Sequence, residues 1–161
     1  MRRRDLLALA AGAAVLPLAV RAQQKAMPVI GFLGTSPSAP VEAANLAGFR
    51  QGLGDTGYSE GQNATIEYRW VESHYDRLPE LTADLVARKV DLIVAQSDPT
   101  ARGAKNATST IPIVFFMGGD PVQQGLVASL ARPGGNLTGV TIFGSGRQIW
   151  FGNTSWVSGT P

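Results

Sequence analysis

One stretch of the 161-residue chain decides its fold, DLIVAQSDPTARGAKNATSTIPIVFF, residues 91–116. Residues 92–95 form a continuous apolar run and predict a buried strand. The polar Ser-Asp-Pro-Thr at 97–100 predicts a loop and the start of a helix with a small, alanine-rich face. A second apolar strand is expected over 111–116, with Pro112 near its beginning, where a missing N–H does least harm. Two buried strands joined by a helix predict a parallel βαβ unit.

The same alternation of strand and helix patterns extends in both directions from this unit. The order β-α-β-α-β-α-β-α-β predicts an α/β fold, a doubly wound parallel sheet of about five strands with helices on both faces. Asp76 is expected to cap the second helix, and Gly118-Gly119-Asp120-Pro121 to open the fourth. Strands are expected over 28–34, 64–70, 92–95, 111–116 and 137–141, and helices over 41–53, 77–86, 100–107 and 121–130.

Three polar loops follow strands of this sheet. They span residues 35–40, 97–100 and 117–121 and are rich in Gly, Pro, Ser, Thr or Asp. Ligands of open parallel sheets bind beyond the carboxyl ends of the strands. The sequence therefore predicts a ligand site at these loops.

Residue types that support chemistry are scarce. The chain has no Cys and one His, which excludes a disulfide scaffold, thiol catalysis and Cys-ligated metal sites. His74 lies in a polar stretch and is interpreted as an exposed loop residue. Residues 52–57 match G-x-G-x-x-G, but they close a helix and precede a strand, whereas the dinucleotide motif follows a strand and opens a helix. We expect no cofactor, no metal ion and no catalytic residue.

The N-terminus has the pattern of an export signal. Three arginines at 2–4 precede an apolar run over 6–20, and Ala22 offers a small residue at a cleavage point. Residues 1–22 are therefore predicted to be a signal peptide, and Arg3-Arg4 suggests the twin-arginine type. The whole chain has a formal net charge of +2. Removing four Arg and one Asp with the leader leaves 10 basic and 11 acidic residues, a net charge of −1, so no nucleic-acid partner is expected.

Several runs of the chain, in the right order over residues 28–142, resemble the periplasmic substrate-binding proteins of ABC importers. The resemblance is to members that bind tryptophan or tyrosine. The runs are YSEGQNATIEYRW (58–70), RLP (77–79), KVDLIVA (89–95), TIPIVF (110–115), GDPV (119–122) and GLVASLARPGGNLTG (125–139).

The resemblance implies a type I periplasmic binding protein, whose two α/β lobes close on a small solute and deliver it to an ABC permease in the inner membrane. It implies a periplasmic, non-enzymatic protein, with residues 23–143 as the N-terminal lobe. An exported α/β enzyme is the alternative function. Ser97, Thr100 and helix-start N–H groups can hold a carboxylate or another anion, and Asp120 can accept from an ammonium group or a hydroxyl. Helix capping is the alternative role of Ser97, Asp98 and Asp120. The ligand-binding residues implied are Thr35, Ser36, Ser97, Asp98, Thr100, Gly118, Gly119 and Asp120.

The end of the chain departs from the family pattern. Residues 144–161 are rich in Gly, Ser and Thr, contain two of the three Trp, and are predicted to be an irregular tail. Members of the family have a charged, Leu-rich helix here and continue into a second lobe. The hypothesis is a frameshift or stop near residue 143 that leaves a truncated chain, impaired in solute binding by itself and prone to self-association through an exposed sheet edge.

Overall fold

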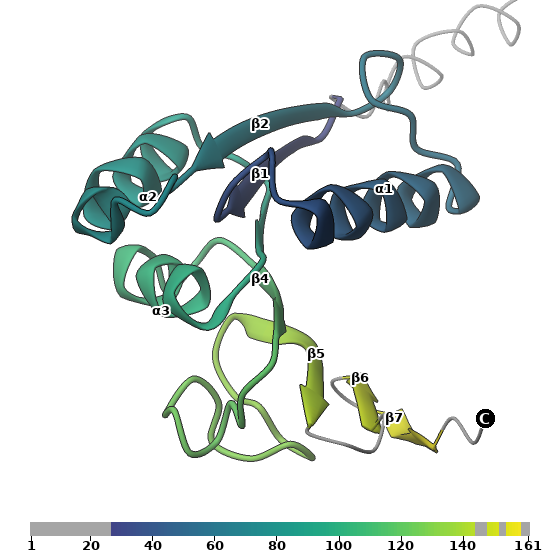
Figure 1. The fold of residues 1–161 in the computed structure, drawn as a ribbon, viewed down its shortest axis with the longest axis vertical. Coiled ribbons are helices and arrows are strands. Elements are labelled where there is room, and N and C mark those ends of the chain that lie inside the picture. The colour runs from purple at the N-terminus through teal and green to yellow at the C-terminus, as the bar shows by residue number, and fades with distance from the viewer. Residues whose placement is uncertain (1–26, 144–147, 152–153, 159–161) are drawn as a thin grey trace, which may run out of the picture.

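The computed structural model describes residues 27–143, 148–151 and 154–158 (Figure 1). The predicted signal peptide, residues 1–22, lies outside the described residues. Three α-helices and a short 3-10 helix alternate with the first strands of the chain. The helices are α1 Pro40–Asp55, η1 Tyr75–Arg77, α2 Leu78–Ala87 and α3 Asp98–Ala107. The strands are β1 Val29–Gly34, β2 Thr65–Trp70, β3 Leu92–Ala95, β4 Ile113–Met117, β5 Leu137–Phe143, β6 Gln148–Phe151 and β7 Thr154–Ser158.

All described strands join one sheet in the order β2-β1-β3-β4-β5-β6-β7. Strands β1 to β5 pair in parallel, and β6 and β7 are antiparallel. The predicted α/β fold with five parallel strands is therefore confirmed. Two short strands stand in the tail, where the sequence predicts irregular structure, and they extend the sheet beyond β5.

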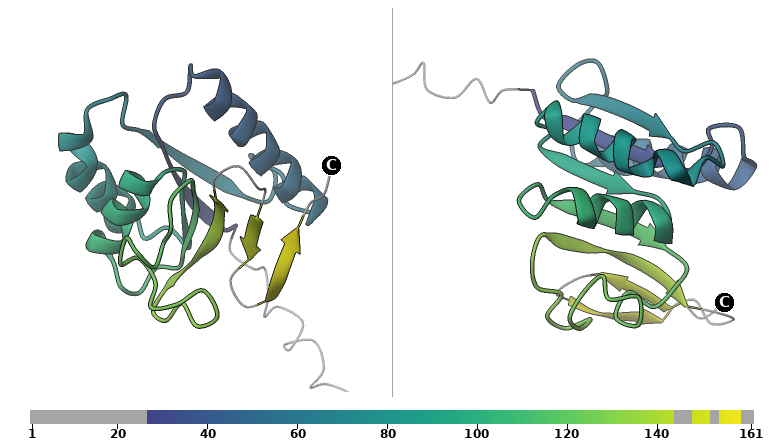
Figure 2. Two further views of the ribbon diagram at one scale, coloured as in Figure 1. Left: turned by 60° about the horizontal axis from the view of Figure 1, so that its bottom comes forward. Right: turned by 90° about the vertical axis from the view of Figure 1, so that its left-hand side faces the viewer.

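The helices cover the two faces of the sheet unequally (Figures 1 and 2). Helices α2 and α3 lie side by side on one face, where Leu85, Ile93 and Phe115 are fully buried. Helix α1 lies on the other face, and its half-buried Phe49 packs on Phe32 of β1 with ring centroids 5.3 Å apart. The side chains of one strand point alternately to the two faces, so each strand contributes to both layers.

The fourth predicted helix is absent. Residues 121–130 form turns, although their apolar residues have helical spacing. One helical turn begins, because Gln124 N–H donates to the Asp120 carbonyl at 3.0 Å. It ends at Gly125, whose φ of 67° is left-handed and stops an α-helix. The prediction of a helix here is therefore wrong.

The predicted cap of the second helix is also wrong. Asp76 lies inside the 3-10 helix η1, so α2 begins two residues later, at Leu78. Arg77 occupies the cap position and makes no side-chain capping hydrogen bond. The interpretation of residues 52–57 is supported: α1 ends at Asp55, and Gly57 turns the chain with a φ of 85°. None of the helices in the described part of the chain is long and apolar enough to cross a membrane.

Candidate functional site

The carboxyl ends of β1 and β3 lie side by side at the point where the winding of the sheet reverses. From β1 the chain crosses to β2 on one side, and β3, β4 and β5 follow on the other. In doubly wound sheets with this order the ligand crevice lies at the β1/β3 switch point. We call the residues that follow β1, β3 and β4 (35–42, 96–100 and 118–120) the carboxyl edge.

The end of β1 is fixed by close packing and by short hydrogen bonds. A Cβ atom on Gly34 would lie 2.3 Å from the Trp70 ring, so only glycine fits beside this indole. The Thr35 hydroxyl donates to Glu42 Oε1 in the first turn of α1, at 2.5 Å. The Ser36 hydroxyl lies 3.1 Å from that of Ser38. These contacts join the loop after β1 to the start of α1.

The end of β3 is joined to both neighbouring helices. Gln96 follows β3, is 6% exposed, and donates from Nε2 to the backbone carbonyl of Glu42 at 3.5 Å. Ser97 caps α3, since its Oγ accepts the Thr100 N–H at 3.4 Å. The Thr100 side chain is fully buried, and its hydroxyl donates to the Ser97 carbonyl at 2.9 Å.

The loop after β4 completes the carboxyl edge. Asp120 Oδ1 accepts N–H groups from Val122 at 2.8 Å and Gln123 at 3.2 Å. Asp98 Oδ2 accepts from the Gln124 side-chain amide at 2.6 Å and so ties α3 to this loop. A Cβ atom on Gly119 would lie 2.7 Å from Asp98 Oδ2, which shows how closely the two loops approach.

The structure thus places all eight predicted site residues at the carboxyl ends of β1, β3 and β4. Ser97 caps α3, Asp120 accepts hydrogen bonds from N–H groups of the turn that follows it, and Asp98 binds Gln124, so these three have structural partners within the chain. Contact of the eight residues with a ligand stays a prediction. The sequence analysis did not predict Glu42 and Gln96 as site residues, although both are polar residues that follow predicted strands. Glu42 is the acid in the first turn of the helix that follows the loop after β1, and Gln96 is the polar residue directly after an apolar strand.

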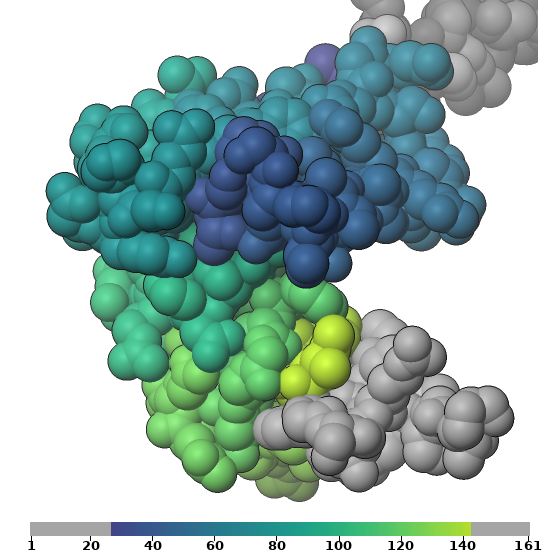
Figure 3. All heavy atoms as spheres, in the orientation of Figure 1, coloured from purple at the N-terminus to yellow at the C-terminus, as the bar shows by residue number. Residues whose placement is uncertain are grey.

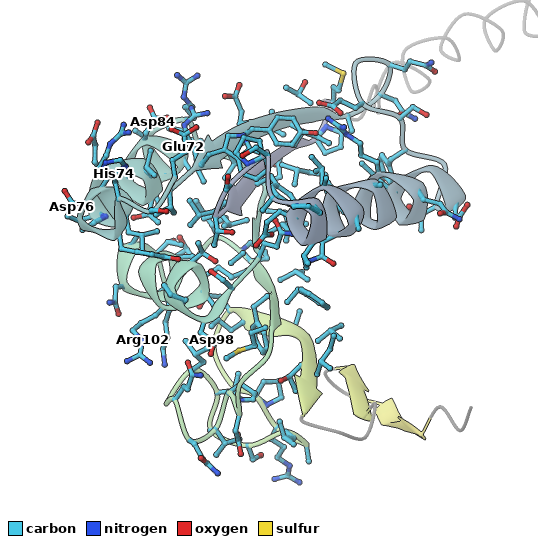
Figure 4. The ribbon with its side chains drawn as sticks, viewed as in Figure 1. Glu72, His74, Asp76, Asp84, Asp98 and Arg102 are labelled. Carbon is cyan, nitrogen blue, oxygen red and sulfur yellow. The ribbon has the colours of Figure 1, made fainter. Side chains whose placement is uncertain are left out.

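A groove lies between α2 and α3. It has a volume of about 920 Å³ and mainly apolar walls that include Leu78, Ala83 and Val86. Asp98, Arg102 and Gln124 are among its polar lining residues. Figure 4 shows Asp98 and Arg102 projecting from α3, and His74 and Asp76 beside α2. His74 is exposed, with Nδ1 2.8 Å from the Glu72 carbonyl, as predicted for a loop residue.

Charged groups away from the carboxyl edge form an ion-pair network. Hydrogen bonds from Arg69 and then Arg88 hold the pKa of Asp84 below its ordinary value of 3.8. Burial raises the pKa of Tyr68, whose hydroxyl donates a hydrogen bond to Glu60 Oε2 at 3.0 Å. Within the described residues, no three His, Cys, Asp or Glu side chains gather in a way that could hold a metal ion.

Comparison with known proteins identifies several relatives. The sequence pattern of the family described as ABC transporter substrate binding protein matches residues 13–144. A tyrosine-binding protein of Clostridioides difficile (strain R20291) is 40% identical over 94 residues, which are 58% of this chain and 27% of that protein.

Several solved structures are also similar to this chain. A ligand-free, open substrate binding protein with adhesive properties from Clostridium difficile is similar, with a TM-score of 0.69 and 33% identity over 73% of this chain and 40% of that one. An ABC domain from Streptococcus pneumonia in complex with L-Trp has a TM-score of 0.66 and 32% identity over 71% and 38% of the two chains. A conserved domain protein from Vibrio cholerae has a TM-score of 0.70 and 30% identity over 74% and 40%. The chain thus spans less than half the length of these relatives.

Proposed function

The chain belongs to the family of ABC transporter substrate-binding proteins, and from this premise we propose that it captures an amino acid for an ABC importer. The observation that carries the proposal is the polar carboxyl edge at the β1/β3 switch point of a fold that this family shares. Solute capture needs groups that bind and orient, and Thr35, Gln96 and Ser97 are such groups at this edge.

Relatives support an amino acid as the solute class. One is named a tyrosine-binding protein, and another was solved in complex with L-Trp. Both are more than 30% identical to this chain over the matched residues. An aromatic amino acid is therefore the first solute to test.

The carboxyl edge offers groups for a carboxylate. The N-terminus of α3 lies at this edge and carries a partial positive charge, which favours an anion. Ser36, with its hydroxyl in an exposed hydrogen bond to Ser38, can exchange that partner for a solute. We propose the eight predicted residues as the solute-facing set, with Thr100 acting through Ser97, since its own side chain is fully buried.

The remaining parts of the proposal concern the protein in the cell. Residues 1–22 act as a signal peptide, residues 23–143 form one α/β lobe, and the exported protein works in the periplasm. It passes its solute to a permease in the inner membrane and performs no chemistry on it. Fusion of residues 1–22 to a reporter that is active only after export tests the first of these statements.

A thermal-shift screen against the twenty amino acids tests the proposed function. A solute that binds only the folded chain raises its free energy of unfolding by RT ln(1 + [L]/Kd) and so raises its melting temperature, which lets millimolar solute reveal weak binding. We expect at least one aromatic amino acid to raise the melting temperature. Ser36→Ala should reduce the rise, whereas Ser109→Ala, an exposed serine at the opposite edge of the sheet, should leave it unchanged. A rise with sugars or organic acids and none with amino acids would contradict the proposed solute class.

A further inference from the structure

Within the part of the chain that the structure describes, two buried oxygen atoms at the carboxyl edge have no hydrogen-bond partner. They are Glu42 Oε2, in the first turn of α1, and Gln96 Oε1, directly after β3. The hydrogen bond from Gln96 Nε2 to the Glu42 carbonyl holds the two residues together across the switch point. More than nine in ten buried polar groups in proteins are paired, so two unpaired acceptors on adjoining residues require an explanation.

The orientation of the Gln96 side-chain amide follows from the hydrogen bond that it donates. Only the amide NH₂ can donate, and it faces the carbonyl of Glu42, so the oxygen must face the other way. A Cβ atom on Gly34 would lie 3.2 Å from Gln96 Oε1 and 2.3 Å from the Trp70 ring. The oxygen is thus directed at the end of β1, close to the indole of Trp70. Because Gln96 is 6% exposed, it has little access to solvent as a substitute partner.

Glu42 presents the second acceptor. Its Oε1 already accepts the Thr35 hydroxyl, which leaves Oε2 for another donor without loss of that bond. Glu42 as a whole is half-buried, so its carboxylate lies close beneath the surface at the carboxyl edge. An ionised carboxylate and an amide oxygen can only accept, and a cationic donor makes the strongest hydrogen bonds to such groups.

We infer that Glu42 and Gln96 bind the α-ammonium group of the amino acid, with Glu42 Oε2 and Gln96 Oε1 as its acceptors. Both side chains must rotate toward the solute to do so, because neither oxygen is accessible to solvent in this structure. The inference rests on the proposed function and adds a specificity determinant to it. An ammonium group has three N–H donors, which suffice for both oxygens and one further contact. Recognition of this group separates amino acids from the corresponding acids that lack it, because without it both acceptors stay unpaired. It also assigns the ammonium group to the β1/β3 side of the carboxyl edge, away from Asp120.

The test compares an amino acid with its deaminated acid. L-Tryptophan and indole-3-propionate share the ring and the carboxylate and differ by the ammonium group. Titration of each into the isotope-labelled chain, followed by NMR, gives both affinities in the millimolar range. We expect L-tryptophan to bind at least about tenfold more tightly, as the loss of a charge-assisted hydrogen bond predicts.

Two variants and a control test whether Glu42 and Gln96 cause the preference for L-tryptophan over indole-3-propionate. Glu42→Gln keeps the shape of the side chain and removes its charge. It should weaken the affinity for L-tryptophan about tenfold and leave the affinity for indole-3-propionate unchanged. Gln96→Met removes the second acceptor with little change in volume and should act in the same direction. Glu80→Gln makes the same chemical change on a side chain of α2 that is 74% exposed, and it should affect neither ligand. Melting temperatures of all variants confirm that each is folded.

The outcomes separate this inference from the function on which it rests. If both ligands bind equally well to the wild-type chain, or if Glu42→Gln and Gln96→Met weaken both alike, the ammonium assignment is wrong and the solute site stands. If no member of the twenty amino acids perturbs the chain, the proposed function fails and the assignment fails with it. A preference for L-tryptophan that disappears in both variants supports the two together.

Discussion

The two faces of the parallel sheet are built from the same strands but are packed differently. On the α2–α3 face, Ile93 and Phe115 have no exposed surface. On the α1 face, their neighbours Val94, Val114 and Phe116 are only half-buried. Alternate residues of one strand therefore differ in burial because of what covers each face, not because of the residues themselves.

The α1 face is itself uneven. Next to β1 and β2 it is dense, because Phe32 packs on Phe49, Tyr68 and Trp70 with ring centroids 5.3–5.7 Å apart. Beyond α1 it opens toward β5, where Ile142 is 42% exposed, and Figure 3 shows the molecule hollowed between these two elements. The candidate solute site lies where the dense part of this face ends, at the carboxyl ends of β1 and β3.

The largest difference between the faces should appear in a pair of adjacent phenylalanines. Phe115→Ala empties a fully buried site and should lower the free energy of unfolding by about 3–5 kcal/mol. Phe116→Ala removes a half-buried ring and should cost less than about half as much. Urea unfolding followed by circular dichroism measures both. Equal costs would show that the α1 face is as well packed as the other.

A pair of glycines tests the dense part of the α1 face. Gly34→Ala forces a Cβ atom against the Trp70 ring and should destabilise the chain by about 1–3 kcal/mol. Gly48→Ala, inside α1 with open space around it, should stabilise the chain by about 0.5–1 kcal/mol, because alanine favours the helix. The melting temperatures of the two variants should move in opposite directions. A shift in the same direction would contradict the packing described at the end of β1.

The smallest effect concerns the ion pairs that join β2 to the α2 side of the sheet. Arg69 and Arg88 lower the pKa of Asp84, so this carboxylate favours the folded state above its unfolded pKa of about 3.8. That contribution is lost as the pH falls through the lower pKa of the folded state. Asp84→Asn should therefore be slightly less stable than the wild type near neutral pH, and the difference should shrink as the pH falls below 3.8 through the lower pKa of the folded state. A difference that stays constant with pH would exclude the ion pair as its cause.

Much of the fold could be predicted from the sequence, because buried parallel strands are continuous apolar runs. Residues 92–95 and 111–116 were found in this way, and the strands β3 and β4 lie within or beside them. The helix predicted over 121–130 failed because apolar spacing alone does not reveal that Gly125 takes a left-handed φ. The Asp76 cap failed because a 3-10 helix inserts itself before α2.

The candidate site was predictable in place but not in detail. Loops that follow the strands of a parallel sheet meet at one edge, and this follows from topology alone. The unpaired oxygens of Glu42 and Gln96 depend on side-chain orientation and on contacts between residues 54 positions apart in the chain. Neither a sequence motif nor the spacing of apolar residues predicts such side-chain orientations and long-range contacts.

Mapping the solute contacts by NMR decides whether the carboxyl edge is the binding site. Titration of the isotope-labelled chain with the amino acid that stabilises it most should shift backbone NMR signals of residues 34–42, 96–98 and 118–120. The side-chain amide of Gln96 should shift with them, while signals of Ala83 and Arg102, in the groove between α2 and α3, should not move. Shifts confined to that groove would contradict the claim that the carboxyl edge at the β1/β3 switch point is the solute site.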